Sequence, residues 1–218
     1  MIRSVSIVPA ILTASKADYR AQLEKINLYA TRIQIDVTDG VFAESPTIDI
    51  TNVWWPQGWT ADLHLMVAQP SAYLDTVFKL SPSLCIFHAE VNEDLLPILD
   101  QLKARGIRAG VALLPSTFPG AVKSYIEKAD HVLIFAGRLG TQGSKADMMQ
   151  TEKIALVRGI NPEVEIGWDG GANLSNIRAL AHADLDVINV GSALATAENP
   201  RETYAAMVAE IDKSGVVL

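Results

Sequence analysis

Three ionisable side chains stand at or near the ends of apolar runs that have the composition of β-strands. Asp36 comes near the end of one run, His64 lies in the next, and Asp169 follows a third. Two carboxylates held close together can remove and return a proton in general acid–base catalysis. These three residues are therefore the first candidates for a functional site at the ends of the strands.

The alternation of side chains along a strand indicates which residues share a face. With a period of two, Gln34 and Asp36 point the same way, and so do His64 and Met66. The opposite face of the first run is apolar and is filled by Ile33, Ile35 and Val37. We therefore expect the polar face of each run to point into a common site, where Asp169 joins it.

Simpler interpretations exist for several polar residues. A lone aspartate at a strand end is usually a turn former or a helix cap, and Asp39 followed by Gly40 fits such a turn. His88 has the pattern of a hydrogen-bonded core histidine. His131 begins a strand-like run and His182 ends a helix-like one, so both are expected to be structural or solvated.

Glycine-rich steps follow the last two strand-like runs, and a further glycine-rich loop spans residues 137–144. Glycine lets the backbone approach a phosphate closely, and nearby helix N-termini add N–H donors. A turn is the alternative explanation for each step taken alone, but their occurrence after successive strands favours a phosphate site. The predicted phosphate-binding residues are Gly140, Gly143, Gly170, Gly171, Gly191 and Ser192.

Strand-like and helix-like segments alternate along the whole chain. The strands are expected at Ser6–Leu12, Arg32–Val37, Asp62–Val67, Leu84–Ala89, Arg108–Leu113, His131–Ala136, Glu163–Trp168 and Val187–Gly191. Helices are expected between them, for example at Ala17–Tyr29, Glu93–Arg105, Ala121–Lys128, Lys153–Gly159, Leu174–Ala181 and Arg201–Asp212. Nearly continuous apolar strands with short connections predict parallel βα units, hence an α/β fold. Eight even units favour a closed (β/α)8 TIM barrel over an open doubly wound sheet, and active sites of such barrels lie at the carboxyl ends of the strands.

Length and composition set the class of protein. The 218 residues are 49% hydrophobic and predict a single barrel domain over 1–218. A net charge of −7 without basic clusters argues against a nucleic-acid partner. The single cysteine, Cys85, lies in an apolar run and is expected to pack in the core. No apolar run approaches the length of a membrane span, which predicts a soluble, cytoplasmic protein with no membrane partner.

The chain resembles the ribulose-phosphate 3-epimerases nearly from end to end. The resemblance rests on the order and spacing of six short motifs, none specific alone: Pro9-Ala10-Ile11-Leu12, Ile35-Asp36-Val37-Thr38-Asp39-Gly40, His64-Leu65-Met66-Val67, Phe87-His88-Ala89-Glu90, Asp169-Gly170-Gly171 and Gly191-Ser192-Ala193. It implies a pentose phosphate pathway isomerase acting on a small phosphorylated sugar.

The resemblance also implies roles for residues. Asp36 and Asp169 would exchange protons with opposite faces of the substrate C3 through an enediolate, and Met66 would line the site. A divalent ion (Zn, Fe, Mn or Co) would be held by Asp36, His64 and Asp169. The phosphate would lie on the glycine steps named above. Stabilising the developing oxyanion makes such a proton acidic enough to remove.

Several positions depart from the family pattern. Gln34 replaces a metal-binding histidine and leaves at most a weak amide ligand, so metal binding is expected to be weakened or lost. Ala10 replaces a serine, and Thr38 replaces a methionine. The loop Arg138–Ser144 carries a new cation at Arg138 and has Gln142 where the family has glycine.

These departures leave alternatives open. A non-catalytic protein that binds a phosphorylated metabolite, or a lyase or aldol-type reaction on a sugar phosphate, competes with the epimerase. A nucleotide decarboxylase is disfavoured because its Asp-x-Lys pattern requires a lysine at Thr38. The resemblance also implies a homo-oligomer. Trp54, Trp55 and Trp59 are expected either in the core of a second helix or in an interface patch.

Overall fold

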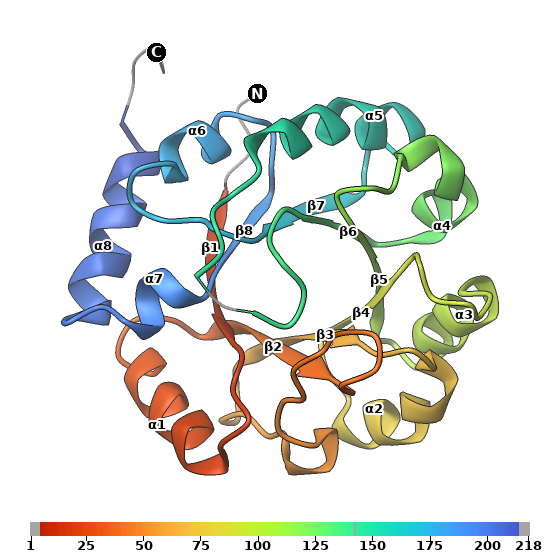
Figure 1. Cartoon of the computed structure of the whole chain (residues 1–218), viewed down its shortest axis with the longest axis horizontal. Coiled ribbons are helices and arrows are strands. Elements are labelled where there is room, and N and C mark those ends of the chain that lie inside the picture. The colour runs from red at the N-terminus through yellow and green to blue at the C-terminus, as the bar shows by residue number, and fades with distance from the viewer. Residues whose placement is uncertain (1–4, 142, 214–218) are drawn as a thin grey trace.

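Apolar strands and the helices that cover them close into a ring. The computed structural model describes residues 5–141 and 143–213. Its eight strands are all parallel, each pairs with the next along the chain, and β1 pairs with β8 to close the barrel. The helices surround this ring, as Figure 1 shows. The predicted (β/α)8 barrel is confirmed, and the doubly wound alternative is wrong.

The element bounds agree with the expected segments to within a few residues. The strands are β1 Ser6–Ile11, β2 Arg32–Thr38, β3 Thr60–Met66, β4 Leu84–His88, β5 Arg108–Leu113, β6 His131–Phe135, β7 Glu165–Asp169 and β8 Val187–Val190. The α-helices are α1 Lys16–Ile26, α2 Leu74–Leu80, α3 Leu96–Ala104, α4 Lys123–Lys128, α5 Glu152–Ile160, α6 Ile177–Ala181, α7 Ser192–Ala195 and α8 Pro200–Ile211. Short 3-10 helices are η1 Ile50–Asn52, η2 Pro70–Tyr73, η3 Pro119–Val122 and η4 Met148–Thr151.

The segment between β2 and β3 differs from expectation. It forms a long loop with only η1, so the prediction of a second helix containing the three tryptophans is wrong. Prolines 46 and 56 and glycines 40 and 58 interrupt this segment and prevent a continuous helix. Trp55 and Trp59 pack partly buried against the core, while Trp54 stays 47% exposed. Self-association through this surface stays a prediction.

The interior of the barrel is filled by an apolar layer between two polar ones. The middle layer is the buried cluster Leu84, Ile86, Ala112 and Leu133. Gly110 and Gly167 make room beside it, since a Cβ on Gly110 would lie 2.7 Å from Ile86 and one on Gly167 would lie 2.6 Å from His131. Cys85 packs on the outer side with the main core, as expected. This packed interior leaves a ligand only the ends of the barrel.

At the amino end of the strands, one carboxylate gathers three basic side chains. Glu165 accepts hydrogen bonds from Arg32 at 3.1 and 3.2 Å, from Arg108 at 2.9 Å, and pairs with His131 at 2.8 Å. Arg32 also contacts the buried Asp62 at 2.8 Å. His131 is therefore structural, as predicted. We call these five residues the lower plug.

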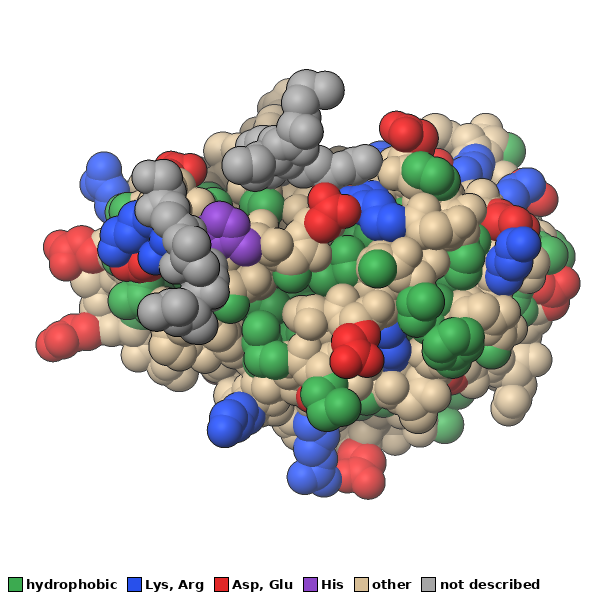
Figure 2. Space-filling model, turned by 90° about the horizontal axis from the view of Figure 1, so that it is seen from above, with side chains coloured by type: hydrophobic (Ala, Val, Ile, Leu, Met, Phe, Trp, Pro, Cys, Tyr) green, Lys and Arg blue, Asp and Glu red, His purple; other side chains and the backbone are tan. Residues whose placement is uncertain are grey.

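Charges on the surface are dispersed. On the face in Figure 2, lysines and arginines are scattered among acidic side chains and do not gather into a basic patch. Among the helices described, none has both the length and the apolar composition to cross a membrane.

The lower plug makes stability depend on pH through Glu165. Burial alone would raise the pKa of Glu165, but hydrogen bonds and charges from His131 and Arg32 outweigh it and hold the pKa well below its ordinary value. A depressed pKa contributes stability above the ordinary carboxylate pKa of about 4.5, and this contribution disappears as the pH falls below that value.

Glu165→Gln should therefore lower the free energy of unfolding at pH 7 by about 2 kcal/mol, because Arg108 and His131 lose their acidic partner and Arg32 keeps only Asp62. The variant should also lose stability less steeply than the native protein below pH 5, as measured by urea denaturation. Glu163→Gln, an exposed neighbour, is the matched control. Equal pH profiles for native protein and Glu165→Gln would contradict this role.

Candidate active site

The carboxyl ends of the strands carry the other polar layer. Asp36 on β2 is the Cα partner of His64 on β3, and Asp169 is the last residue of β7. The Nδ1 atom of His64 lies 3.0 Å from Oδ1 of Asp36 and 3.5 Å from Oδ2 of Asp169. The expectation that these three residues converge is confirmed.

Gln34 lies beneath the two carboxylates and joins them. Its side-chain nitrogen donates to Oδ1 of Asp36 at 2.9 Å and to Oδ2 of Asp169 at 2.7 Å. The side chain is fully buried, and its Oε1 atom has no hydrogen-bond partner among the described residues. In this orientation the amide donates to both carboxyl groups and presents no oxygen to them.

A chain of side chains continues from His64 into the core. Nε2 of His64 lies 2.9 Å from Nε2 of His88, and Nδ1 of His88 lies 3.4 Å from Oε2 of Glu90. The Glu90 carboxylate favours a proton on Nδ1 of His88, so we assign Nε2 of His88 as the acceptor and Nε2 of His64 as the donor. Nδ1 of His64 is thereby left to face Asp36 and Asp169. His88 is a core histidine as predicted, but it also orients His64.

The pKa shifts follow from burial and from these contacts. Burial raises the pKa of Asp36 and the charge of Asp169 adds to it, against the hydrogen bonds from His64 and Gln34. Burial alone would lower the pKa of His64, but both aspartates raise it to about 9. Without a metal ion, His64 is therefore positively charged at neutral pH between the two carboxyl groups.

The shifts at the inner end of the chain have the opposite sense. Burial lowers the pKa of His88 to about 4, which keeps this ring neutral. Burial would raise the pKa of Glu90, but the nearby His88 ring and hydrogen bonds from Thr117 and Leu114 lower it overall. An ionised Glu90 beside a neutral His88 supports the proton arrangement assigned above.

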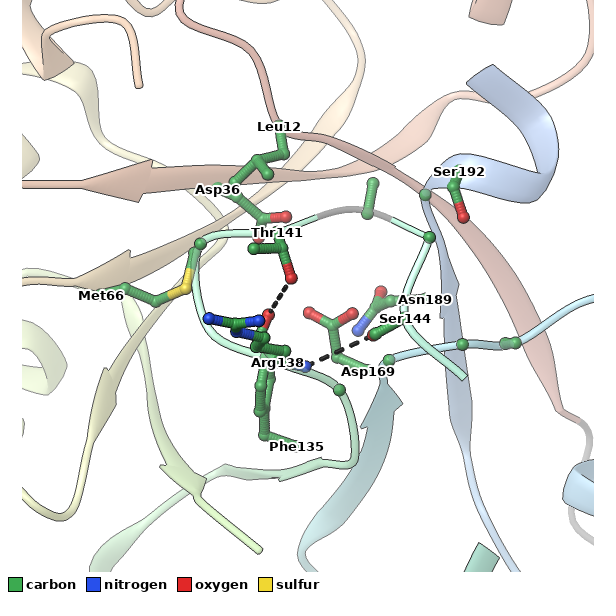
Figure 3. Close-up of a pocket in the computed structure, with 18 residues that line it drawn as sticks. Leu12, Asp36, Met66, Phe135, Arg138, Thr141, Ser144, Asp169, Asn189 and Ser192 are labelled. Atoms are coloured by element: carbon green, nitrogen blue, oxygen red, sulfur yellow. Dashed lines mark hydrogen bonds between the residues drawn. The ribbon is translucent and has the colours of Figure 1, made fainter. Parts of the chain in front are cut away.

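A pocket opens directly above this cluster and encloses about 520 Å³, its open mouth included. Asp36 and Asp169 point into it from β2 and β7, and Met66 and Phe135 form part of its wall (Figure 3). The structure brings the remaining predicted ligand-binding residues to the same pocket: Gly140, Gly143, Gly170, Gly171, Gly191 and Ser192.

Glycine is required after β7 by the loop that packs on it. Gly170 has a φ of +119°, and a Cβ on it would lie 2.2 Å from the backbone nitrogen of Gly137. Gly171 has a φ of +68°, and a Cβ on it would lie 2.1 Å from the backbone nitrogen of Ala146. These glycines therefore let the β6–α5 loop lie against the β7 turn, whether or not a phosphate also binds there. Their predicted phosphate role stays a prediction.

The β6–α5 loop crosses the mouth of the pocket, as Figure 1 shows in the middle of the ring. It reaches the β2 side, where a Cβ on the buried Gly140 would lie 3.2 Å from Ala43. Arg138 in this loop is the one cationic side chain among the described residues that line the pocket. The predicted substitution at Gln142 falls outside the described residues.

Two other departures from the family pattern have visible consequences. The hydroxyl of Thr38 donates to the Ser45 carbonyl, and its N–H donates to Thr47 at 3.0 Å, so Thr38 anchors the loop after β2. Asp39 accepts from the N–H groups of Val41 and Phe42, which confirms the predicted turn. Ala10 lines the pocket with a methyl group.

Sequence reasoning missed Asn189, which lies beside Asp169 on β8 and lines the pocket. An asparagine within the apolar run Val187–Val190 was the available signal, because it interrupts that strand as Asp36 interrupts its own. In the sequence, Glu90 stands out only as part of the motif Phe87-His88-Ala89-Glu90. It lies beyond the end of β4, where strand periodicity does not determine the direction of its side chain.

The donor set fits a divalent metal ion. The ligand atoms of Asp36, His64 and Asp169 lie within 4.8 Å of one another. The ring of His64 is also oriented by a hydrogen bond from its other nitrogen, as metal-binding histidines commonly are. Gln34 fits less well. Its nitrogen faces both carboxylates, so the amide must rotate before its oxygen can reach an ion.

A parallel barrel with an acidic pair and glycine-rich turns at the carboxyl ends of its strands defines the class: a (β/α)8 barrel with an enzyme-like pocket at its mouth. A model of the ribulose-phosphate 3-epimerase family matches residues 6–195. The chain belongs to this family.

Relatives of known name agree with this assignment. The chain is 30% identical over 219 residues to the cytoplasmic isoform of ribulose-phosphate 3-epimerase from Oryza sativa subsp. japonica, covering 97% of this chain and 96% of that one. It is 27% identical over 208 residues to the ribulose-phosphate 3-epimerase of Schizosaccharomyces pombe, with 92% and 91% covered.

Solved structures support the fold. A 3-hexulose-6-phosphate synthase from Salmonella typhimurium superposes with a TM-score of 0.71 at 14% identity, covering 95% of this chain and 98% of that one. Orotidine 5'-phosphate decarboxylase from Pyrococcus horikoshii OT3 gives a TM-score of 0.69 at 19% identity, with 96% and 100% covered. At these identities the likeness concerns the barrel alone.

The hydrogen bonds of Gln34 predict weak metal binding that a single substitution strengthens. Gln34→His removes the amide nitrogen that competes with a metal ion for both carboxylates. In its place the variant has an imidazole, which can ligate the ion. We expect Co²⁺ to bind the variant at least about 10-fold more tightly, which equals about 1.4 kcal/mol. The absorbance of bound Co²⁺ and calorimetric titration measure this affinity. Gln57→His, on the surface, is the control, and equal affinities for native protein and Gln34→His would contradict the prediction.

Proposed function

We propose that this protein is a sugar-phosphate 3-epimerase, which interconverts ribulose 5-phosphate and xylulose 5-phosphate or a related pair of ketose phosphates. The observation that carries the proposal is the pair Asp36 and Asp169, which enter one pocket from non-adjacent strands and share the donors Gln34 and His64. Epimerisation needs two groups that exchange protons with opposite faces of one carbon, and such a pair supplies them.

The two carboxyl groups divide the proton transfers between them. Burial and the neighbouring Asp169 raise the pKa of Asp36, which favours proton sharing within the pair. One carboxyl group removes the proton on C3, and the other delivers a proton to the opposite face. In the reverse reaction the roles exchange.

Charge on the substrate oxygens develops next to His64. A divalent metal ion bound by Asp36, His64 and Asp169 would supply Lewis-acid stabilisation of that charge. The Glu90–His88 pair holds the His64 ring with Nδ1 directed at the site in either state. Gln34 keeps both carboxyl groups in place from below.

The other end of the substrate is assigned to the turns after β7 and β8. Gly170, Gly171, Gly191 and Ser192 offer backbone N–H groups for a phosphate, as the loops after strands seven and eight commonly do in this fold. Arg138 adds the positive charge that a dianionic ligand favours in an otherwise acidic pocket.

The Gln34 amide also favours a second candidate. The amide nitrogen donates to both carboxyl groups and so occupies the groups that would transfer protons. This geometry also suits a protein that binds a phosphorylated metabolite without turning it over. The two candidates differ in one measurable property. Only the enzyme exchanges the C3 hydrogen of its ligand with solvent.

Asp36→Asn and Asp169→Asn should each reduce interconversion by about 10²- to 10⁴-fold, because an amide neither accepts nor donates the transferred proton. NMR of D-ribulose 5-phosphate in D2O, with and without added Zn²⁺, follows deuterium at C3 and the appearance of xylulose 5-phosphate. Asp100→Asn, on the outer face of α3, is the matched control and should retain full activity. Full activity in either active-site variant would contradict the mechanism. Binding without exchange in the native protein would favour the second candidate.

A further inference from the structure

Asn189 occupies a position on β8 that faces the ligand. It is the Cα partner of Asp169 on β7, and partners in adjacent parallel strands direct their side chains to the same side of the sheet. Asn189 therefore points into the barrel beside the reacting carboxylate. Its side chain lines the pocket and lies next to Asp169 in Figure 3.

The oxygen of this side chain lacks a partner. Asn189 is only 3% exposed, and its Oδ1 atom has no hydrogen-bond partner among the described residues. A buried polar atom without a partner destabilises a folded protein, so each such atom calls for an explanation. Gln34 has a similar unpartnered oxygen but lies beneath the pocket and does not line it. Both oxygens are shielded from solvent, but the Asn189 side chain lines the pocket and the Gln34 side chain does not, so a bound ligand meets the Asn189 carboxamide.

The position of Asn189 along the strand indicates which part of a ligand it meets. It is level with Asp169, where proton transfer is proposed, and two residues before Gly191, where the phosphate is proposed. Two residues of a strand span roughly 7 Å. A side chain between these points faces the atoms that connect the reacting carbon to the phosphate-bearing carbon.

We propose that Asn189 binds the hydroxyl group on the carbon between the reacting carbon and the phosphate-bearing carbon, which is the C4 hydroxyl of a five-carbon 2-ketose 5-phosphate. This assignment rests on the proposed function for the direction in which the sugar lies. A hydroxyl both donates and accepts a hydrogen bond, so it satisfies either end of the carboxamide. Asn189 is then a specificity-determining residue that selects polyhydroxy ketose phosphates against analogues without that hydroxyl.

The physical basis of the selectivity is the unpartnered amide. A ligand with the hydroxyl gives the buried carboxamide a hydrogen-bond partner, whereas a ligand without it leaves the oxygen unpaired. We therefore expect the native protein to prefer D-ribulose 5-phosphate over its 4-deoxy analogue by about 10- to 100-fold in dissociation constant. Calorimetric titration of both ligands measures this ratio.

Asn189→Leu provides the decisive comparison, because leucine is close in shape to asparagine and carries no polar atom. The variant should bring the ratio of the two dissociation constants close to one. Its melting temperature without ligand should be unchanged or higher, since the unpartnered polar atom is gone. A purely structural asparagine would behave in the opposite way, with a lowered melting temperature and an unchanged ratio.

Asn161→Leu is the matched control. Asn161 follows α5 at the amino end of the barrel, where its amide donates to the Ile126 carbonyl at 3.0 Å. Its replacement should lower the melting temperature and leave the ligand ratio as in the native protein. A native protein that does not distinguish the two ligands, or an Asn189→Leu variant that keeps the native ratio, would overturn the assignment.

The same titrations separate this inference from the proposed function. If neither ligand exchanges the C3 hydrogen, the epimerase proposal fails, and the ratio of dissociation constants still decides the role of Asn189. If exchange occurs, the ratio of kcat/KM values for the two ligands should follow the ratio of dissociation constants in both native protein and variant. An exchange rate that is unaffected by the 4-hydroxyl would count against Asn189 alone.

Discussion

The structure depends on holding two carboxyl groups close together where little water can separate them. Burial raises the pKa of Asp36, and the charge of the neighbouring Asp169 adds to this rise. Two donors make the arrangement stable: the Gln34 amide bridges both groups from below, and the His64 ring faces both from the side. Glu90 and His88 orient that ring from within the core. The chemistry and the stability of the site therefore rest on the same hydrogen bonds.

One strand, β7, contributes residues both to this site and to a second polar cluster at the other end of the barrel. On β7, Glu165 holds the lower plug, Gly167 leaves room for His131, and Asp169 enters the pocket. These residues are two apart and share the inward face. The apolar layer of Leu84, Ile86, Ala112 and Leu133 lies between the clusters. Because the plug closes the amino end, changes in the mouth can alter chemistry while the opposite end maintains the fold.

The family match and the closed ring establish the scaffold, and three polar residues distinguish the mouth of the barrel in this chain. Gln34 donates to both aspartates, Arg138 contributes the positive charge of the pocket wall, and Asn189 lines the pocket with a carboxamide. Each is an ordinary uncharged or basic side chain within a strand or loop. Their effects arise from position, since all three lie within or directly under one pocket.

The strands, the closed barrel and the convergence of Asp36, His64 and Asp169 were predictable because they depend on short periodicities: two for strands, and the regular alternation of βα units. The regular alternation of strands and helices did not predict the segment before β3 correctly. Prolines and glycines interrupt this segment, so it forms a loop where a helix was expected. The sequence could place Gln34 beside Asp36 but not choose whether its oxygen or its nitrogen faces the carboxylates. It could not establish the contact between His64 and His88 or the unpartnered oxygen of Asn189 either, because both depend on where side chains of different strands meet. Sequence by itself determined the element order and the acidic pair; only the closed ring decided which polar atoms are satisfied and which remain for a ligand.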